Sequence, residues 1–188
     1  MRYDFASDNT AGMAPAAMQA LIAANEGYAR SYGSDDVTAR AADQIRRRLD
    51  ADAEVRFVFS GTAANAIALS MLAYPHEAVL AHHAAHVCTD ETGAPGFFGQ
   101  GVGLLGVPGE SGKIDLKAMS VLLEEPEVGH RQPPAALSLT QATEYGGVYT
   151  EEELRHLIGP VKALGYGVHM DGVTQRLHRP DQVTQLLL

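Results

Sequence analysis

A ten-residue segment, HHAAHVCTDE, concentrates side chains that bind metals or transfer protons. It follows a short apolar run, and its chemically capable members are His82, His83, His86, Cys88, Asp90 and Glu91. A metal site would need several of these ligands to converge, whereas residues at the junction of a strand and a loop project in different directions. The segment therefore fits a metal site, an organic cofactor site, or solvated loop residues around one buried histidine.

A second segment, SGTAAN at 60–65, has the composition of a phosphate-binding turn. It lies between an expected strand and an expected helix, so Gly61 would let the backbone approach a ligand while Thr62 contributes a hydroxyl group. Amide groups at the start of a helix attract negative charge, which makes a phosphate the natural ligand. The simpler interpretation is a threonine that caps the helix.

Asp171 belongs to a third segment, HMDG at 169–172, where an apolar run meets a glycine turn. A carboxylate at the end of a strand can pair with a cation, although an aspartate there can also serve only as a turn residue. The segment SDN at 7–9, which includes Ser7, can likewise be only a turn. Asp171 is therefore a candidate for binding a positively charged group.

Alternating strands and helices are expected to position these segments. Apolar runs of strand length occur at 55–59, 78–82, 103–108, 135–140 and 166–170, and helical patterns occur at 14–25, 37–49, 62–72, 115–124 and 151–164. Ser34 and Asp35 are candidate N-caps of the second helix, and Thr150 with Glu153 forms a capping box for the last one. This alternation predicts a three-layer α/β fold with a mostly parallel sheet, which binds ligands at the carboxyl ends of its strands.

Composition narrows the classes of partner. The 188 residues are 46% hydrophobic and carry a formal net charge of -9, with an isoelectric point near 5.3. An acidic chain without a dense lysine or arginine stripe is a poor partner for nucleic acid and for anionic membranes. No apolar stretch of about 18 residues and no signal-peptide pattern occurs. Together with a single cysteine, Cys88, these features predict a cytoplasmic protein without a disulfide.

Six sequence blocks in this order resemble the low-specificity L-threonine aldolases of the beta-eliminating lyase group, which are fold-type-I pyridoxal-phosphate enzymes. The blocks are FASDNTAG, YGSDDVTARA, SGTAANAIAL, AAHVCTDETGAPGFF, SLTQATEYGGVY and GVHMDG. The resemblance covers residues 4–172 and corresponds to the N-terminal portion of these enzymes. It implies the large domain of the aspartate-aminotransferase-like fold and pyridoxal 5'-phosphate as cofactor.

The resemblance also implies roles for cofactor-binding residues. Gly61 and Thr62 match the residues that hold the cofactor phosphate, and His86 matches the histidine that stacks on the pyridine ring. Asp171 matches the aspartate paired with the ring nitrogen. A carboxylate beside that nitrogen keeps it protonated, so the ring can accept the electrons left at the α carbon when a bond breaks.

The activity implied is a retro-aldol cleavage of a β-hydroxy amino acid. L-threonine or L-allo-threonine would give glycine and acetaldehyde, and the proton of the β-hydroxyl group would pass to His86 or to a water that His86 orients. Ser7 matches the family serine near the substrate carboxylate. Glu91 and Glu144 fall in matching blocks without an assigned role. Family members form homo-oligomers.

The chain departs from the family pattern after Gly172. Family members continue DGAR where this chain reads DGVT, so Thr174 stands in place of an arginine. The family's Schiff-base lysine lies further along and has no counterpart among the lysines of this chain, which are Lys113, Lys117 and Lys162. We therefore expect a large domain truncated before its last strands and a chain that is inactive as it stands.

Three segments are expected: an N-terminal helical arm at 1–54, a partial pyridoxal-phosphate-binding large domain at 55–172, and a non-family tail at 173–188. The strand at 55–59 would keep an open edge because its family partner is missing. Two alternatives stand beside the aldolase interpretation. One is a non-catalytic fragment that binds the cofactor weakly or pairs with an intact subunit, and the other is a metal-binding α/β protein that uses His82, His83 and His86.

Overall fold

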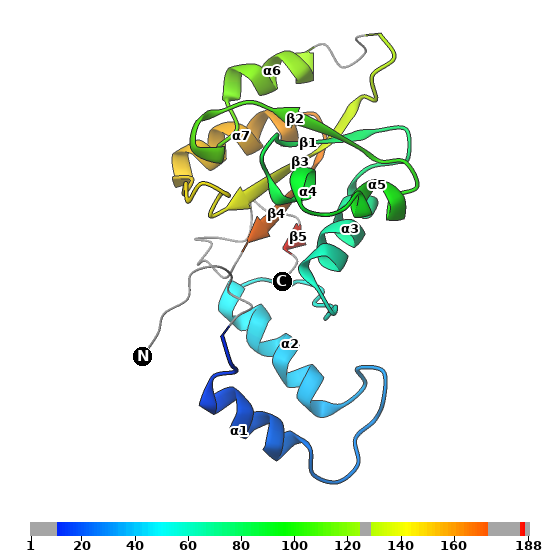
Figure 1. Ribbon diagram of the computed structural model, residues 1–188, viewed down its shortest axis with the longest axis vertical. Coiled ribbons are helices and arrows are strands. Elements are labelled where there is room, and N and C mark those ends of the chain that lie inside the picture. Colours follow the sequence, from blue (N-terminus) through cyan, green and yellow to red (C-terminus); the bar gives the residue numbers. More distant parts are fainter. Residues whose placement is uncertain (1–10, 125–128, 173–184, 187–188) are drawn as a thin grey trace. The chain divides into compact units, whose positions relative to one another are not determined.

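The computed structural model describes residues 11–124, 129–172 and 185–186 of the chain, which divides into two compact units, Met1–Ile45 and Arg46–Leu188 (Figure 1). In the first unit, helix α1 spans Pro15–Ala24 and has no buried residue. Helix α2 spans Asp36–Leu49. The Asp35 carboxylate caps α2, because it accepts hydrogen bonds from the backbone N–H of Thr38 (2.8 Å) and from its hydroxyl (2.7 Å). Both predicted N-terminal helices are therefore confirmed.

The second unit is built on a parallel sheet. Its strands are β1 (Ala78–His82), β2 (Gly103–Val107), β3 (Pro134–Gln141), β4 (Gly167–Gly172) and the short β5 (Gln185–Leu186). They lie in the order β2-β1-β3-β4-β5, and every neighbouring pair is parallel. The predicted strands at 78–82, 103–108, 135–140 and 166–170 are confirmed, as is the mostly parallel sheet.

Helices cover both faces of this sheet, which gives the predicted three layers (Figure 1). Helix α3 (Gly61–Leu72) and the short α4 (His86–Thr89) and α5 (Ala94–Phe98) belong to one face, and α6 (Leu116–Glu124) and α7 (Glu151–Ala163) to the other. The capping box at the start of α7 is confirmed, since Thr150 and Glu153 exchange side-chain and backbone hydrogen bonds. Within the described ranges, no helix is long and apolar enough to cross a membrane.

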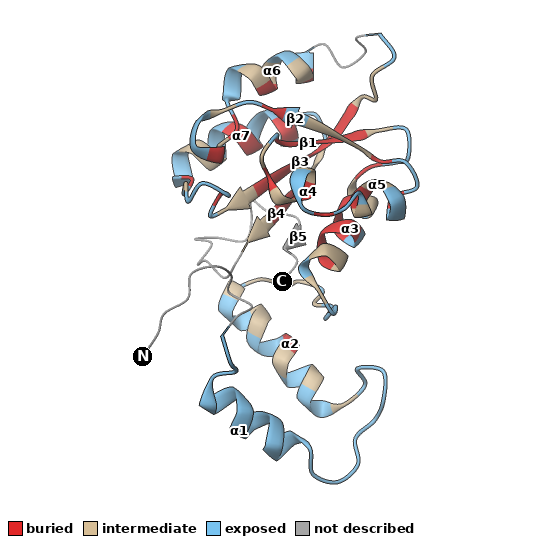
Figure 2. Cartoon of the chain, viewed as in Figure 1, coloured by how far each residue is buried: buried red, intermediate tan, exposed pale blue. Residues whose placement is uncertain are grey.

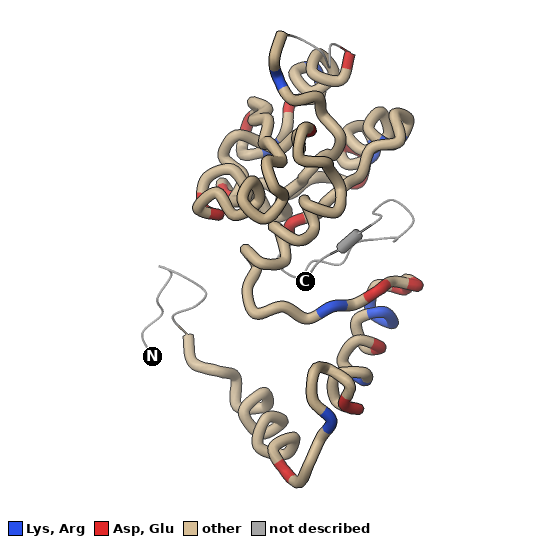
Figure 3. The backbone as a smooth tube through the Cα atoms, turned by 90° about the vertical axis from the view of Figure 1, so that its right-hand side faces the viewer, with Lys and Arg blue, Asp and Glu red and all other residues tan. Residues whose placement is uncertain are grey.

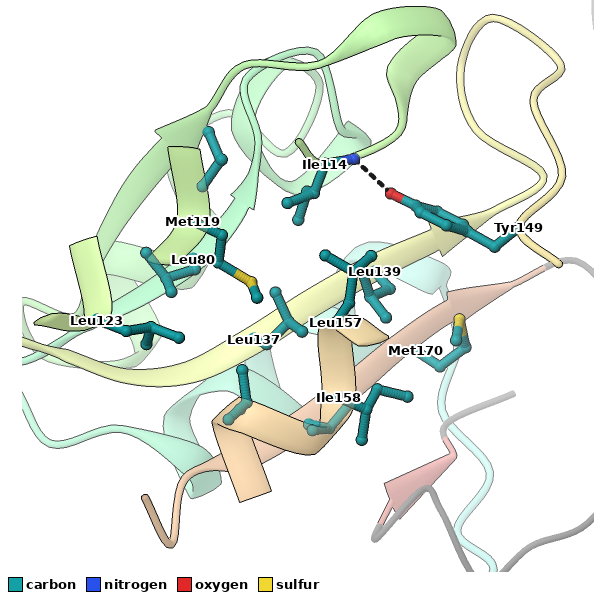
Figure 4. Close-up of a cluster of buried hydrophobic side chains, with 13 residues drawn as sticks. Leu80, Ile114, Met119, Leu123, Leu137, Leu139, Tyr149, Leu157, Ile158 and Met170 are labelled. Carbon is teal, nitrogen blue, oxygen red and sulfur yellow. Dashed lines mark hydrogen bonds between the residues drawn. The ribbon is translucent and has the colours of Figure 1, made fainter. Parts of the chain in front are cut away.

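The two faces of the sheet have different cores. On the α6 and α7 face the buried side chains are large, and Leu80, Leu137, Leu139 and Met170 from the strands meet Met119 and Leu157 from the helices (Figure 4). The α3 face instead packs small residues, among them Ala81, Ala85, Ala135 and Ala136. Burial is concentrated in the strands and in the helix surfaces that face them (Figure 2). Small side chains let α3 approach the sheet closely.

The strand predicted at 55–59 is wrong, because the structure has no strand at these residues. Phe57 is 53% exposed and Phe59 is 95% exposed, so the alternating apolar pattern is not matched by burial. Alternation describes how side chains would face, but a strand also needs a neighbouring backbone with which to form its ladder.

Charged residues of both signs are distributed along the described chain (Figure 3). The densest basic run is Arg46, Arg47 and Arg48 in the last turn of α2, where positive charge interacts favourably with the helix dipole. The guanidinium of Arg46 also donates to the carbonyl oxygen of Ala53 at 2.7 Å. This run therefore has a local role in ending the helix.

Candidate functional site

The carboxyl edge of the sheet gathers most of the residues singled out in the sequence. Strand β1 ends there with His82, and β4 ends there with Asp171 and Gly172. Helix α4 begins at His86, four residues after β1 ends. Because α3 leads to the start of β1 at the opposite edge, its own N-terminus lies at the carboxyl edge. Parallel strands bind ligands at this edge.

The start of α3 is arranged so that its first amides are available to a ligand. Ser60 is the N-cap, and its hydroxyl accepts a hydrogen bond from the backbone N–H of Ala63 at 3.1 Å. The first bond of the helical pattern runs from Ala64 to the carbonyl oxygen of Ser60. The amides of Gly61 and Thr62 precede that bond. The cap is therefore Ser60, and the interpretation of Thr62 as the N-cap is wrong.

Glu91 is the centre of a buried polar cluster beside α3. Glu91 is only 2% exposed. Its Oε1 accepts hydrogen bonds from the Asn65 side-chain amide and from Nδ1 of His86, both at 2.8 Å. Burial raises the pKa of Glu91, but interactions with Asn65, Thr62 and His86 outweigh it and the net shift is downward. Glu91 is therefore a buried carboxylate held in its ionised form.

His86 stands where this cluster meets solvent, with 42% of its side chain exposed. Burial lowers the pKa of His86, but the hydrogen bond and charge of Glu91, together with the charges of Asp171 and Glu144, outweigh it, and the pKa is raised. Glu144 is exposed in the loop after β3. Three carboxylates thus favour the protonated imidazole.

Asp171 is the carboxylate at the end of β4. Burial raises the pKa of Asp171, and although the charge of His86 and a hydrogen bond from Asn65 oppose this, the net shift is upward. Asp171 is in register with Thr140 of β3, whose buried hydroxyl has no hydrogen-bond partner in the described part of the chain. A half-buried carboxylate of this kind is stabilised by a cationic partner.

The structure does not bring the other histidines into this cluster. His82 is 3% exposed, its Nε2 lies 3.2 Å from the carbonyl oxygen of Gly109, and its Nδ1 accepts from the backbone N–H of Ala84. Nδ1 of His83 lies 3.4 Å from the carbonyl oxygen of Val107. Across residues 11–124, 129–172 and 185–186, no three His, Cys, Asp or Glu side chains are grouped so that they could hold a metal ion.

Of the predicted site residues, the structure brings His86, Thr62 and Asp171 together around Glu91, with Gly61 beside Thr62. Ser7 and the predicted tail beyond Gly172 lie outside the described residues, apart from the backbone of β5. Sequence reasoning missed Asn65, which links Glu91 to Asp171. The spacing could have indicated Asn65, because a residue three positions after Thr62 lies on the same side of a helix.

His169 is a second polar residue missed by the sequence argument. It lies two residues before Asp171 on the same side of β4, is completely buried, and its Nδ1 is 2.9 Å from the hydroxyl of Ser138. Its Nε2 has no hydrogen-bond partner among the described residues. Burial lowers the pKa of His169 to about 4 from an ordinary value of 6.5, against the opposing charge of Glu91.

This buried histidine predicts a loss of stability in acid. Because the pKa of His169 is lower in the folded chain than in the unfolded chain, the unfolded chain binds the proton first. The contribution of His169 to stability is therefore fully present above pH 6.5 and is lost as the pH drops toward about 4. At about 1.4 kcal/mol per pH unit, the loss approaches about 3 kcal/mol. Urea unfolding at several pH values measures it. The variant His169→Gln, which cannot titrate, is the control, and equal acid sensitivity of the two proteins would contradict the assignment.

The model of the beta-eliminating lyase family matches residues 4–174. Two curated relatives are low specificity L-threonine aldolases, one from Pseudomonas sp. (strain NCIMB 10558), 45% identical over 169 residues, and one from Pseudomonas aeruginosa, 44% identical over 168 residues. Each alignment covers 89% of this chain and 49% of the relative. The chain thus spans about half the length of these curated relatives.

A solved structure supports the same grouping. A threonine aldolase from Leishmania major superposes with a TM-score of 0.84 at 32% identity, over 91% of this chain and 50% of that protein. The predicted aminotransferase-like α/β fold is therefore confirmed. The family model alone covers well over half of the sequence, and the chain belongs to the beta-eliminating lyase family.

Proposed function

We propose that this chain carries the pyridoxal-phosphate-binding portion of a threonine aldolase that cleaves L-threonine or L-allo-threonine to glycine and acetaldehyde. The observation that carries the proposal is the cluster at the carboxyl edge, where His86 and the half-buried Asp171 are joined through Asn65 and Glu91 beside the start of α3. The aldolase names of the relatives support the choice of reaction.

The residues present fit pyridoxal phosphate in two respects. A Cβ added to Gly61 would meet no atom of the described residues within 4 Å, so these residues leave space beside the amides at the start of α3 for a phosphate group. The raised pKa of Asp171 reflects a carboxylate that burial disfavours in its charged form, and a protonated pyridine nitrogen is a partner that would relieve this cost. The hydroxyl of Thr140, which has no hydrogen-bond partner among the described residues, belongs to the residue in register with Asp171.

Each residue has a distinct task in the proposed reaction. The amides of Gly61 and Thr62 bind the phosphate dianion, and Asp171 holds the proton on the ring nitrogen. The cofactor supplies an electron sink for the pair released when the bond between the α and β carbons breaks. His86 would be the residue beside the ring and would take the proton of the β-hydroxyl group, directly or through a water that it orients. We assign Ser7 to the substrate carboxylate.

No lysine of this chain is a candidate for linking the cofactor covalently. The sequence contains Lys113, Lys117 and Lys162. Lys113 donates to both carboxylate oxygens of Glu153 at 2.9 Å and lies over the Tyr149 ring. Lys117 is on α6 and Lys162 on α7, the helices of the opposite face. We therefore propose that this chain binds the cofactor without a covalent bond and does not turn over by itself.

Titration of the purified chain with pyridoxal phosphate tests the binding proposal. We expect saturable binding of pyridoxal phosphate, measured by the quenching of tyrosine fluorescence. Pyridoxal, which lacks the phosphate, should bind much more weakly. Equal affinity for the two ligands would contradict the role of α3. The variant Thr62→Pro removes one backbone N–H group at the start of α3. It should weaken the binding of pyridoxal phosphate and leave the binding of pyridoxal unchanged.

An assay for acetaldehyde tests the proposal about the lysine. With saturating pyridoxal phosphate and L-threonine, we expect the chain to form no acetaldehyde above the rate of the free cofactor. Borohydride reduction should likewise leave no single lysine modified, as judged by mass spectrometry. Rapid release of acetaldehyde, or selective labelling of one of the three lysines, would show that this chain supplies its own Schiff-base lysine.

A further inference from the structure

We propose that Glu91 is a positioning residue that holds the imidazole of His86 as its Nδ1-protonated tautomer and leaves Nε2 as the nitrogen that accepts a proton. Nothing in the sequence blocks or in the names of the relatives assigns this role. The chemical use of Nε2 rests on the proposed function, whereas the tautomer itself does not.

The hydrogen bond between the two residues fixes the tautomer. Oε1 of Glu91 lies 2.8 Å from Nδ1 of His86. An ionised carboxylate can only accept hydrogen bonds, so the hydrogen between these atoms must belong to Nδ1. A neutral imidazole carries one N–H, and Nε2 is then left with its lone pair.

Burial and a second hydrogen bond hold the Oε1 atom of Glu91 in place for this contact. Its side chain is 1% exposed, and the same Oε1 accepts a second hydrogen bond from the amide of Asn65, a residue that is itself 6% exposed on α3. Water does not compete for a carboxylate in this position, so the bond to His86 is stronger than it would be at the surface. Asn65 thereby ties the orientation of His86 to the helix that begins at Gly61.

Only one of the carboxylates that act on His86 also forms a hydrogen bond with it, so an experiment can separate the effect of charge from that of the bond. The carboxylates that act on the ring are Glu91 on the α4 side, Asp171 at the end of β4 and Glu144 after β3. Glu144 and Asp171 act through space, whereas Glu91 acts through space and also bonds Nδ1. Removing the charge of Glu144 should therefore leave the tautomer unchanged.

The tautomer decides which nitrogen of His86 can act as the base in the proposed reaction. With Nδ1 bonded to the buried carboxylate, Nε2 is the ring nitrogen of this 42% exposed side chain that is left to take a proton from a substrate hydroxyl group or from a water. As Nε2 becomes protonated, the charge of Glu91 stabilises the imidazolium. A histidine in the opposite tautomer would present a donor to the same hydroxyl group and could not serve as the base.

Nitrogen-15 NMR of the ring of His86 in the wild-type chain tests the proposal directly. We expect a protonated Nδ1 and an unprotonated Nε2 at a pH above the pKa of His86. The Nε2-protonated tautomer, or the averaged signals of an unconstrained imidazole, would overturn the proposal. This measurement needs neither cofactor nor activity, so a failure of the cofactor titration leaves its result intact.

Two variants separate the role of Glu91 from a general effect of charge. In Glu91→Gln we expect the pKa of His86, followed by NMR, to fall more than in the matched control Glu144→Gln, because only the first change weakens the bond to Nδ1. Equal shifts in the two variants would overturn the proposal. If Glu91→Gln does not fold, the tautomer in the wild-type chain still decides the question.

Discussion

Replacing Asp171 by asparagine is expected to weaken the binding of pyridoxal phosphate by about 30-fold or more. Removing one partner of a buried, hydrogen-bonded charge pair typically costs about 2–5 kcal/mol, and the lower figure corresponds to about 30-fold in affinity. Asparagine preserves the size of the side chain, and burial already disfavours the charged form of Asp171 in the absence of a cation. The loss therefore reports the missing attraction to the ring nitrogen.

The control for this prediction is Glu144→Gln, which removes an exposed carboxylate that acts on the same histidine. It should change the affinity far less, because exposed charges are screened by solvent. A phosphate ester whose aromatic ring lacks the nitrogen completes the comparison. It should bind the wild-type chain and Asp171→Asn equally. If Asp171→Asn binds pyridoxal phosphate as tightly as the wild-type chain does, Asp171 has a different role.

The largest loss of stability is expected from Leu137→Ala. Leu137 is completely buried on β3, is paired in register with Leu80 of β1 and Val168 of β4, and belongs to the core on the α6 and α7 face (Figure 4). Substitutions of this kind cost about 2–5 kcal/mol, because they remove buried apolar surface and leave a cavity. Native domains have a margin of only about 5–15 kcal/mol, so urea unfolding should show a large shift of the midpoint.

A matched substitution is available in Leu164→Ala, since Leu164 is 50% exposed at the end of α7. We expect it to cost less than about 1 kcal/mol. A similar loss in both variants would mean that β3 is not at the centre of the packed core in solution.

Most of the fold was predictable because its signals are local. The strand from Ala78 to His82 was predicted to the residue, and the capping box of Thr150 and Glu153 marks the start of α7 in sequence and in structure. The segment at 55–59 shows where local signals fail. Its letters alternate like those of a strand, but pairing depends on a second backbone that the segment itself does not encode.

The sequence predicted individual residues of the site but not the hydrogen bonds that connect them. His86 and Asp171 were placed at the carboxyl edge by the strands that precede them, and the structure puts them in electrostatic contact. The residues that join them, Asn65 and Glu91, are 26 positions apart. A hydrogen bond over that distance is set by how α3 packs on the sheet, and neither the spacing nor the composition of a single segment contains that information.

The unlike cores on the two faces of the sheet have a practical consequence for protein engineering. The residues of the site belong to the α3 face or its edge, where alanines such as Ala81 and Ala136 fill the space beneath the helix. A larger side chain there would move α3 and, with it, Gly61 and Asn65. On the α6 and α7 face the buried leucines and methionines pack on the other side of the sheet from α3, so they are the positions at which a library for thermostability can be explored while the chemistry is kept.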